Sequence, residues 1–267
     1  MLKLAIAGVG GKMGGRILAL ASNDKEVEGV EVFESPSHAL TGKKIPFRSS
    51  EIEVFDSADK PLALCDVLID FTSPDATLKN LDVAVSLKKP VVVGTTGFDS
   101  EGKKKISEVA SVIPVVFSPN MSVGVNLLFR LVEIAARTLD ARGYDTEIVE
   151  LHHNLKKDSP SGTAAKLAEI VQQVSSGYGK KNILYGGRGQ GITGPRRPDE
   201  IGVHAVRAGD IVGEHTVYFV SNGERLELTH RAHSRDCFAS GAIAAAKWLV
   251  AKTGVPGLYS MWDVLGI

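Results

Sequence analysis

Residues 150–164 read ELHHNLKKDSPSGTA and bring an acid, two adjacent histidines, two lysines and a Ser-Gly-Thr step into one short stretch. Side chains of these types could ligate a metal, transfer protons, bind an anion or simply form a solvated polar loop. Which of the four applies depends on the elements that hold the stretch and on the chemistry found elsewhere in the chain.

A metal site is not expected in this stretch. Zinc and iron sites normally use three protein ligands at recognisable spacing, and two adjacent histidines do not supply such a set. The histidines that follow show neither an HxxxH nor an HxH pattern; they are His204, His215, His230 and His233. The sequence therefore predicts no bound metal.

Proton transfer and anion binding suit the stretch better. Residues 145–153 read as a strand, so His152 and His153 at its end should point to opposite faces. A histidine that titrates near neutral pH and Lys156 make a proton-transferring pair. A helix is expected from about residue 162, and the free N–H groups of its first turn form a site for a carboxylate. A polar loop stays open as the alternative.

A second candidate site is the glycine-rich run AGVGGKMGG at 7–15, between an expected strand and an expected helix. Gly8, Gly11 and Gly14 form G-x-x-G-x-x-G in place of the usual dinucleotide fingerprint G-x-G-x-x-G. Positions without side chains let the backbone approach a pyrophosphate, whose charge then faces the helix N-terminus. Lys12 adds a cation there. A tight turn without a ligand would have a similar sequence.

Two further features favour a nicotinamide cofactor over a plain turn. Glu34 ends the second expected strand, where an acid can accept hydrogen bonds from the adenosine ribose. The loop GTTGF at 94–98 closes the fourth expected strand. Because Glu34 would repel the 2′-phosphate of NADPH and Ser35 brings no compensating charge, we expect NADH to be favoured. Together, the acid–base pair, the anion site and the cofactor indicate a reductase of a small anionic imine or carbonyl.

The composition fits an enzyme that acts on small molecules. Among 267 residues, 43% are apolar, which allows a substantial core. Lys plus Arg equals Asp plus Glu at 31 each, which argues against a nucleic-acid or membrane partner. The two cysteines, Cys65 and Cys237, form no CxxC pair, so we expect a reducing, cytoplasmic location. No apolar run has transmembrane length, and the apolar start is too short and glycine-rich for a signal peptide.

The first part of the chain alternates short β-branched runs with helical stretches, which is typical of an α/β fold. Strands are expected over 2–7, 30–34, 66–72, 90–96 and 113–118, and helices over 12–23, 74–89 and 100–111. Strands joined by crossover helices predict a doubly wound parallel sheet that forms a dinucleotide-binding domain.

The pattern changes after residue 122. Helices are expected over 124–140 and 162–175, and strands over 145–153, 201–208, 213–221 and 223–232. The last three strands are not separated by helices, so they predict an α+β domain with a mixed sheet. A final apolar helix at 238–254 should return to the first domain. We therefore predict a dinucleotide-binding domain of 1–122 and 237–267, and a substrate-binding and oligomerisation domain of 123–236.

The run EIVELHHNLKKDSPSGTA at 147–164 fills every fixed position of the signature E-[IV]-x-E-x-H-x-x-x-K-x-D-x-P-S-G-T-A. With this run, the chain resembles the dihydrodipicolinate reductase (4-hydroxy-tetrahydrodipicolinate reductase) family of lysine and diaminopimelate biosynthesis. The resemblance extends over nearly the whole chain, through AGVGGKMG, IDFTSP, VGTTGF, SPNMSVGVN, VRAGDIVGEHTV and GERLELTHRAHSRDCFASGA.

The resemblance implies NAD(P)H-dependent reduction of a cyclic dicarboxylate, 4-hydroxy-tetrahydrodipicolinate, to tetrahydrodipicolinate by a homotetramer. It implies His152 as proton donor or acceptor and Lys156 as the acid that protonates the substrate. It also implies that His153 contacts the substrate and that Gly162 with Thr163 binds a carboxylate. The residues implied to line the cofactor are Gly8, Val9, Gly10, Gly11, Lys12, Met13, Glu34, Gly94, Thr95, Thr96, Ser118, Pro119, Asn120 and Met121.

Two positions depart from many relatives. Ser35 stands where an arginine commonly follows the acid, which agrees with a preference for NADH. Leu155 replaces a basic residue or a histidine, and weaker substrate binding is expected there. Two other functions stay open: another two-domain dehydrogenase, of the aspartate-semialdehyde or homoserine type, and a non-catalytic dinucleotide-sensing protein. Neither of them explains the HHxxKxDxPSGTA pattern.

Overall fold

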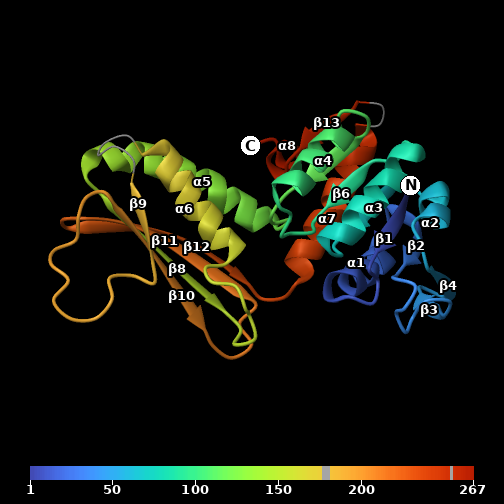
Figure 1. The fold of residues 1–267 in the computed structure, drawn as a ribbon, viewed down its shortest axis with the longest axis horizontal. Coiled ribbons are helices and arrows are strands. Elements are labelled where there is room, and N and C mark those ends of the chain that lie inside the picture. The colour runs from blue at the N-terminus through green and yellow to red at the C-terminus, as the bar shows by residue number, and fades with distance from the viewer. Residues whose placement is uncertain (176–180, 253–254) are drawn as a thin grey trace. The chain divides into compact units, whose positions relative to one another are not determined.

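The computed structural model describes residues 1–175, 181–252 and 255–267. These residues form two compact units. One unit joins Met1–Val123 with Arg235–Ile267, and the other is Gly124–Ser234. Each unit builds its own sheet, which the labels in Figure 1 identify.

The first unit contains an eight-stranded sheet in the order β13-β7-β6-β5-β1-β2-β4-β3. Every pair is parallel except β3 with β4. The strands are β1 (Leu2–Ala7), β2 (Val27–Phe33), β3 (Lys44–Phe47), β4 (Ser50–Phe55), β5 (Val67–Asp70), β6 (Val91–Val93), β7 (Pro114–Phe117) and β13 (Gly257–Tyr259). The predicted doubly wound parallel sheet is therefore confirmed.

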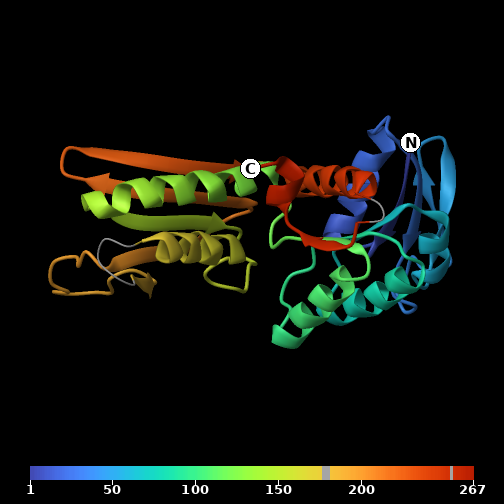
Figure 2. The same ribbon diagram turned by 90° about the horizontal axis from the view of Figure 1, so that it is seen from above.

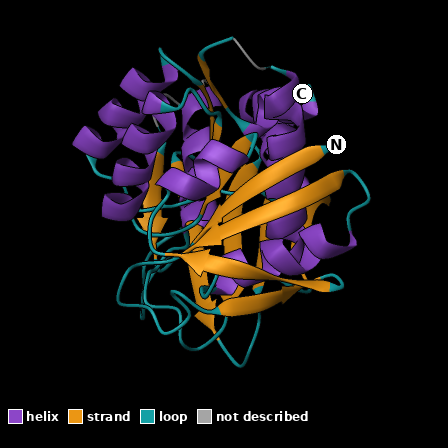
Figure 3. Cartoon of the chain, turned by 90° about the vertical axis from the view of Figure 1, so that its right-hand side faces the viewer, coloured by secondary structure: helices purple, strands orange, loops and turns teal. Residues whose placement is uncertain are grey.

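Helices cover both faces of this sheet, as Figure 3 shows. They are α1 (Lys12–Asn23), α2 (Asp59–Leu64), α3 (Pro74–Ser86), α4 (Ser100–Ala110), α7 (Asp236–Ala251) and α8 (Met261–Leu265). Alternate residues of β1 enter different cores, because successive side chains of a strand point to opposite faces. Leu4 and Ile6 pack in the core beneath α1 and α7, and Ala5 and Ala7 pack in the core beneath α2, α3 and α4.

Three elements that adjoin the candidate cofactor site, β1, α1 and α3, start where the sequence predicted. The strand β1 and the helix α1 have the predicted bounds. Ser73 caps α3 by accepting from the amide of Ala76, with Pro74 in the first turn. The strand β2 begins at Val27, earlier than predicted. Five elements of this unit were not predicted, namely β3, β4, α2, β13 and α8.

The second unit contains a five-stranded sheet in the order β12-β11-β8-β10-β9. The central strand β8 is antiparallel to β11 and parallel to β10, so the predicted mixed sheet is confirmed. The strands are β8 (Asp145–His152), β9 (Asn182–Tyr185), β10 (Glu200–Arg207), β11 (Gly213–Ser221) and β12 (Glu224–Ala232). The helical segments are α5 (Val123–Leu139), the 3₁₀ turn η1 (Asp140–Arg142) and α6 (Gly162–Val174).

The helices α5 and α6 lie on one face of this sheet (Figures 1 and 2), and α6 contacts β8, β10 and β11. Residues along β8 therefore alternate between buried and half-buried. The buried series, which faces the helices, ends in Glu150 and His152. Among the described residues, no helix is both long and apolar enough to cross a membrane.

Candidate active site

The glycine loop between β1 and α1 has the geometry that a pyrophosphate requires. Gly8 has a φ of +69°, in the left-handed region that favours glycine. A Cβ at Gly14 would overlap the carbonyl oxygen of Gly8, so α1 approaches the end of β1 as closely as it does only because this residue is glycine. Gly11 is the N-cap of α1, and since it has no side chain it leaves the first-turn amides to another acceptor.

Glu34 binds this loop directly. Its Oε1 accepts the amide of Gly10 at 2.9 Å and its Oε2 accepts the amide of Ser35 at 3.0 Å. On the other side, the ring of His38 lies so close that a Cβ at Gly10 would overlap it. The acid predicted to bind the adenosine ribose is therefore held beside the glycine loop.

A cavity of about 750 Å³ opens at the carboxyl ends of the parallel strands in this unit. It begins at Gly8 and Gly11 and extends along Phe33 and Phe71. Its charged lining residues are Glu34, Asp56, Asp59, Asp75 and Lys79. The position is the one at which open α/β sheets bind nucleotides, and the excess of carboxylates makes the cavity electronegative.

The loop after β6 is fixed by a buried polar network around Asp70. The carboxylate of Asp70 accepts hydrogen bonds from Thr72 at 2.7 Å, Asn80 at 2.8 Å, Thr77 at 3.0 Å and Thr95 at 3.3 Å. The hydroxyl of Thr95 therefore points into the protein, and a cofactor would meet this residue through its backbone. The adjacent Thr96 is exposed.

The other residues predicted to line the cofactor differ in what they expose. The side chains of Val9 and Met121 are buried in the core and Met13 packs against it, so these three would contribute backbone atoms. A Cβ at Gly94 would overlap the ring of Phe71. Four of the residues predicted to line the cofactor are exposed to solvent, namely Gly10, Gly11, Lys12 and Pro119. In the loop after β7, Ser118 donates to the carbonyl of Asn120 at 2.8 Å, and the Asn120 side chain accepts the amide of Ser122 at 2.8 Å.

In the second unit, one buried carboxylate joins several parts of the histidine stretch. The side chain of Glu150 is 0% exposed and is hydrogen-bonded to Nδ1 of His152. It accepts the amide of Ser161 at 3.0 Å. The guanidinium of Arg207 donates to both carboxylate oxygens, at 2.8 and 2.9 Å.

His152 is enclosed on its remaining sides. Its ring meets the ring of His215 edge-on, with the centroids 5.1 Å apart. A Cβ at Gly213 would lie 3.0 Å from Nε2 of His152. The Nε2 of His215 is hydrogen-bonded to the hydroxyl of Ser161 at 3.0 Å.

The helix predicted to bind a carboxylate begins where expected. Ser161 is the N-cap of α6, and its hydroxyl accepts the amide of Ala164 at 3.2 Å. The next residue, Gly162, is exposed and has open space where a Cβ would stand. Thr163 follows in the first turn, so the two residues predicted to bind substrate lie directly after a residue that Glu150 holds.

Lys156 lies in the loop between β8 and α6. Its Nζ pairs with the carboxylate of Asp158 at 2.9 Å, and its amide donates to the carbonyl of His153 at 3.1 Å. The guanidinium of Arg207 donates to the backbone carbonyl of Asp158 at 2.7 Å, which ties this loop to Glu150. Leu155 is 79% exposed.

The surroundings of Glu150 and His215 lower the pKa of both side chains. Burial on its own raises the pKa of Glu150, but the hydrogen bonds from His152, Arg207 and the Ser161 amide outweigh it and lower this pKa to about 2. Burial, helped by the neighbouring His152, lowers the pKa of His215 to about 3. Near neutral pH, Glu150 is therefore an anion and His215 is neutral.

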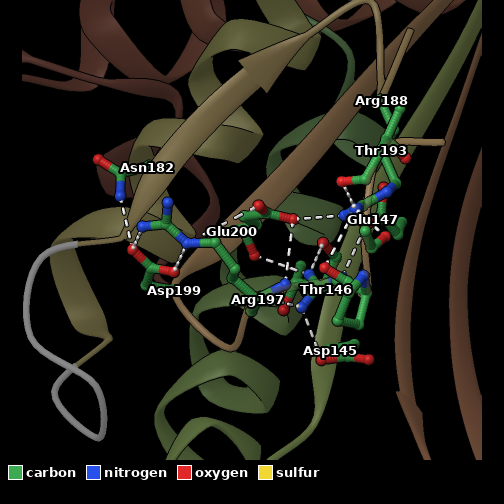
Figure 4. A network of polar contacts seen from close by, with 12 residues as sticks. Asp145, Thr146, Glu147, Asn182, Arg188, Thr193, Arg197, Asp199 and Glu200 are labelled. Atoms are coloured by element: carbon green, nitrogen blue, oxygen red, sulfur yellow. Dashed lines mark hydrogen bonds and ion pairs between the residues drawn. The ribbon is translucent and has the colours of Figure 1, made fainter. Parts of the chain in front are cut away.

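The half-buried face of β8 carries a second cluster, around Glu147. The carboxylate of Glu147 is hydrogen-bonded to Nε2 of His204 at 2.8 Å and accepts from Arg196 at 3.0 Å. Arg196 also pairs with Asp145 at 2.6 Å. Figure 4 shows the surrounding network, in which Arg188 of the loop after β9 pairs with Glu200 at 2.8 Å.

Sequence reasoning missed Glu150, Arg207, His215 and Asp70 as parts of the two candidate sites. The two-residue spacing of Glu150 and His152 on a strand was the signal for one shared face. Arg207 and His215 come from neighbouring strands, and their proximity could not be seen without the sheet order. Among the described residues, no group of three or more His, Cys, Asp or Glu side chains could hold a metal ion.

The doubly wound sheet with its glycine loop, and the buried acid–histidine cluster beside a helix N-terminus, define an NAD(P)H-dependent oxidoreductase. Comparison with known families narrows this class. The family model described as dihydrodipicolinate reductase, N-terminus, matches residues 2–121, and the one described as dihydrodipicolinate reductase, C-terminus, matches residues 124–265. The chain belongs to the dihydrodipicolinate reductase family, which confirms the resemblance in its motifs.

Individual relatives agree over their full length. The 4-hydroxy-tetrahydrodipicolinate reductase of Citrifermentans bemidjiense is 47% identical over 100% of both chains. That of Aquifex aeolicus is 45% identical over 100% of this chain and 99% of its own. Among solved structures, a dipicolinate-bound dihydrodipicolinate reductase from Paenisporosarcina sp. TG-14 is 26% identical, with a TM-score of 0.77 over 98% of each chain.

More distant structures share only the fold. Aspartate semialdehyde dehydrogenase II of Vibrio cholerae is 12% identical, with a TM-score of 0.57 over 94% of this chain and 99% of its own. The two-domain plan alone therefore does not separate this family from the dehydrogenase that the sequence left open as an alternative. The residues of the 147–164 run make that separation.

Proposed function

We propose that this chain reduces 4-hydroxy-tetrahydrodipicolinate to tetrahydrodipicolinate in lysine and diaminopimelate biosynthesis, with His152 and Lys156 supplying protons. The observation that supports these roles is the Glu150 carboxylate, which holds Nδ1 of His152 and the amide of Ser161 at once. A proton-transferring imidazole and an anion-binding helix start are thereby fixed together.

The substrate is a dicarboxylate, so its site must neutralise negative charge. The first-turn amides of Gly162 and Thr163 are proposed to bind one carboxylate, since they begin a helix and Gly162 leaves open space beside it. Lys156 and His153 are proposed to contact the substrate nearby. Lys156 pairs with Asp158 in the structure, and a bound carboxylate would compete for the same ammonium.

The cofactor, when bound, supplies a hydride to the substrate. The carbon that gains electron density must then take a proton, and His152 or Lys156 is proposed to donate it. General acid catalysis of this kind contributes roughly 10²- to 10⁴-fold in rate. The Nδ1 of His152 is held by Glu150, so the proton transfer is assigned to Nε2.

NADH is proposed as the favoured cofactor. The carboxylate of Glu34 lies beside the glycine loop, and the acids Asp56, Asp59 and Asp75 line the same cavity. A 2′-phosphate would meet this negative field with Lys79 as the one lysine of the lining. Steady-state kinetics with both cofactors tests the preference, and a higher kcat/KM with NADPH would reject it.

A homotetramer built through the second unit is proposed as the assembly. Exposed apolar side chains on this unit support it: Leu127, Leu131 and Ile134 on α5, and Val206 and Leu226 on the strands. Light scattering on the purified chain measures the assembly directly. The cytoplasmic location that the cysteine content favours stays a prediction.

The activity is tested by supplying the purified chain with NADH and either 4-hydroxy-tetrahydrodipicolinate or aspartate semialdehyde. We expect turnover of the first compound only. In His152→Ala and Lys156→Ala, kcat should fall by roughly 10²-fold or more while the Kd for NADH is retained. Near-normal turnover in both variants would refute the proposed roles.

A further inference from the structure

We propose that Glu150 is a positioning residue that sets the tautomer of His152 and the orientation of the α6 N-terminus through one carboxylate. Arg207 and Asp158 extend this control to Lys156. The proposal rests on the function proposed above and adds residues for which the sequence predicted no role.

The first step of the argument concerns His152. An ionised carboxylate only accepts hydrogen bonds, so the contact with Glu150 requires the proton on Nδ1 of the neutral imidazole. The lone pair, or the second proton of the charged ring, then lies at Nε2. That atom faces Gly213, whose missing side chain leaves room for it. Glu150 thus determines which nitrogen exchanges a proton.

The second step concerns the anion site. The other oxygen of Glu150 accepts the amide of Ser161, and the Ser161 hydroxyl caps α6 at Ala164 and meets His215. The residue before Gly162 is therefore held through its amide and through its hydroxyl. The first-turn amides keep a fixed direction, which anion binding at a helix start requires.

The third step concerns Lys156. Arg207 bridges the two oxygens of Glu150 and also donates to the carbonyl of Asp158. The Asp158 carboxylate in turn holds Nζ of Lys156. Both proposed proton donors and the anion site therefore depend on one ion pair, between the buried Glu150 and the half-buried Arg207, and a change there should alter kcat and substrate KM together.

The test replaces the buried pair by apolar residues of similar length, Glu150→Met with Arg207→Met. Removing both members of the ion pair leaves neither charge without its partner, so the variant should fold. The matched control is Glu147→Met with Arg196→Met, which removes a glutamate–arginine pair on the other face of the same strand.

For the Glu150/Arg207 variant we expect kcat lower by roughly 10²-fold and a raised KM for the dicarboxylate, with the Kd for NADH within about twofold. Nitrogen-15 NMR of His152 should change from a single Nδ1–H tautomer to a mixture. The control should keep the wild-type kcat and tautomer.

The tautomer measurement needs no turnover, so it separates this inference from the proposed function. A wild-type chain that fails to reduce the substrate would refute the proposed function. A Glu150/Arg207 variant that keeps the Nδ1–H tautomer and wild-type kcat would overturn the positioning role. As a conservative variant, Arg207→Lys keeps Glu150 and should keep the tautomer, while its kcat falls by less than in the double variant.

Discussion

Two clusters, each of one glutamate, one histidine and one arginine, form around glutamates on opposite faces of β8, and they differ in their exposure to solvent. The cluster of Glu150, His152 and Arg207 is on the helix-covered face, where the glutamate side chain is 0% exposed. The cluster around Glu147 is on the opposite face, with the glutamate 32% and its histidine 39% exposed.

The same three residue types therefore hold their partners with different strength in the two clusters. Water competes for the hydrogen bonds of a half-exposed ion pair, which makes such a pair contribute little to stability. Water cannot replace the partners of a buried carboxylate, so these partners are held in one geometry. Removing one residue of such a cluster leaves the hydrogen-bonding group of another without a partner. The comparison indicates that burial, rather than residue type, suits the Glu150 cluster to the positioning role proposed for it.

The largest expected effect is on stability. Glu150→Ala removes the carboxylate shared by Nδ1 of His152, the buried amide of Ser161 and the 19%-exposed side chain of Arg207, and should lower the free energy of unfolding by about 3–5 kcal/mol. Glu147→Ala should lower it by about 1 kcal/mol or less. Urea unfolding, with hydrogen exchange of the β8 amides measured by mass spectrometry, compares the two. Equal losses would show that burial does not distinguish the clusters.

The next effect is on turnover, through a glycine beside each cluster. A methyl group at Gly213 would stand 3.0 Å from Nε2 of His152, whose ring is held by Glu150 and His215 and cannot retreat. Gly213→Ala should therefore lower kcat by roughly 10- to 100-fold while NADH binding is unchanged.

The matched change at the other cluster is Gly202→Ala. Its methyl group would overlap the carboxylate of Glu147, but that carboxylate is the far end of a flexible, half-exposed side chain and can turn aside. We expect kcat within about twofold of the wild type, because the Glu147 cluster does not contact the proposed proton donors. A comparable loss of kcat in both glycine variants would contradict this assignment.

The third effect is a pH dependence of stability. The pKa of His215 is about 3 in the folded chain against 6.5 as its ordinary value, so between these pH values the unfolded chain binds more protons. Stability should fall as the pH is lowered from 6.5, by at most about 1.4 kcal/mol per pH unit. Glu150, with a pKa of about 2 against 4.5, adds a loss of the same sign only below pH 4.5.

Urea midpoints measured between pH 7.5 and 4 separate the two groups. His215→Gln should reduce the slope between pH 6.5 and 4.5, leave the part due to His230, whose pKa burial also lowers, and keep the loss below pH 4.5. A His215→Gln curve with the wild-type slope above pH 4.5 would show that another group causes the acid loss.

Much of this architecture could be predicted from the sequence, because buried strands and amphipathic helices impose their period locally. β1 and α1 have the predicted bounds for this reason. The hairpin of β3 and β4 was missed since its mostly exposed face carries charged residues such as Glu51 and Glu53, which hide the strand pattern. β9 and β13 were too short to show a period.

The candidate site likewise contains residues whose proximity the sequence could predict and residues whose proximity it could not. His152, Lys156 and the Ser-Gly-Thr step lie within one stretch, so the sequence alone could predict that they lie near one another. Glu150 was also within reach, because residues two apart on a strand share a face. Arg207 and His215 enter from β10 and β11, and their contacts depend on strand order and register, which a single sequence does not fix.

The smallest expected effect comes from Arg196→Lys in the half-exposed cluster. The guanidinium of Arg196 donates to Glu147, to Asp145 and to the carbonyls of Thr146 and Glu200. A lysine ammonium has three donors on a flexible stem and cannot reach this planar set of acceptors together. We expect a loss of about 1 kcal/mol in unfolding free energy, smaller in added salt, with kcat/KM unchanged.

The matched substitution Arg207→Lys sharpens the result. The same chemical change in the buried cluster removes the fork that spans both oxygens of Glu150 and the bond to the Asp158 carbonyl. It should cost more stability than Arg196→Lys, be less sensitive to salt because the carboxylate is buried, and lower kcat as well. If Arg196→Lys instead lowered kcat as much as Arg207→Lys does, the Glu147 cluster would belong to the catalytic site, and the division of β8 into a catalytic face and a structural face would be wrong.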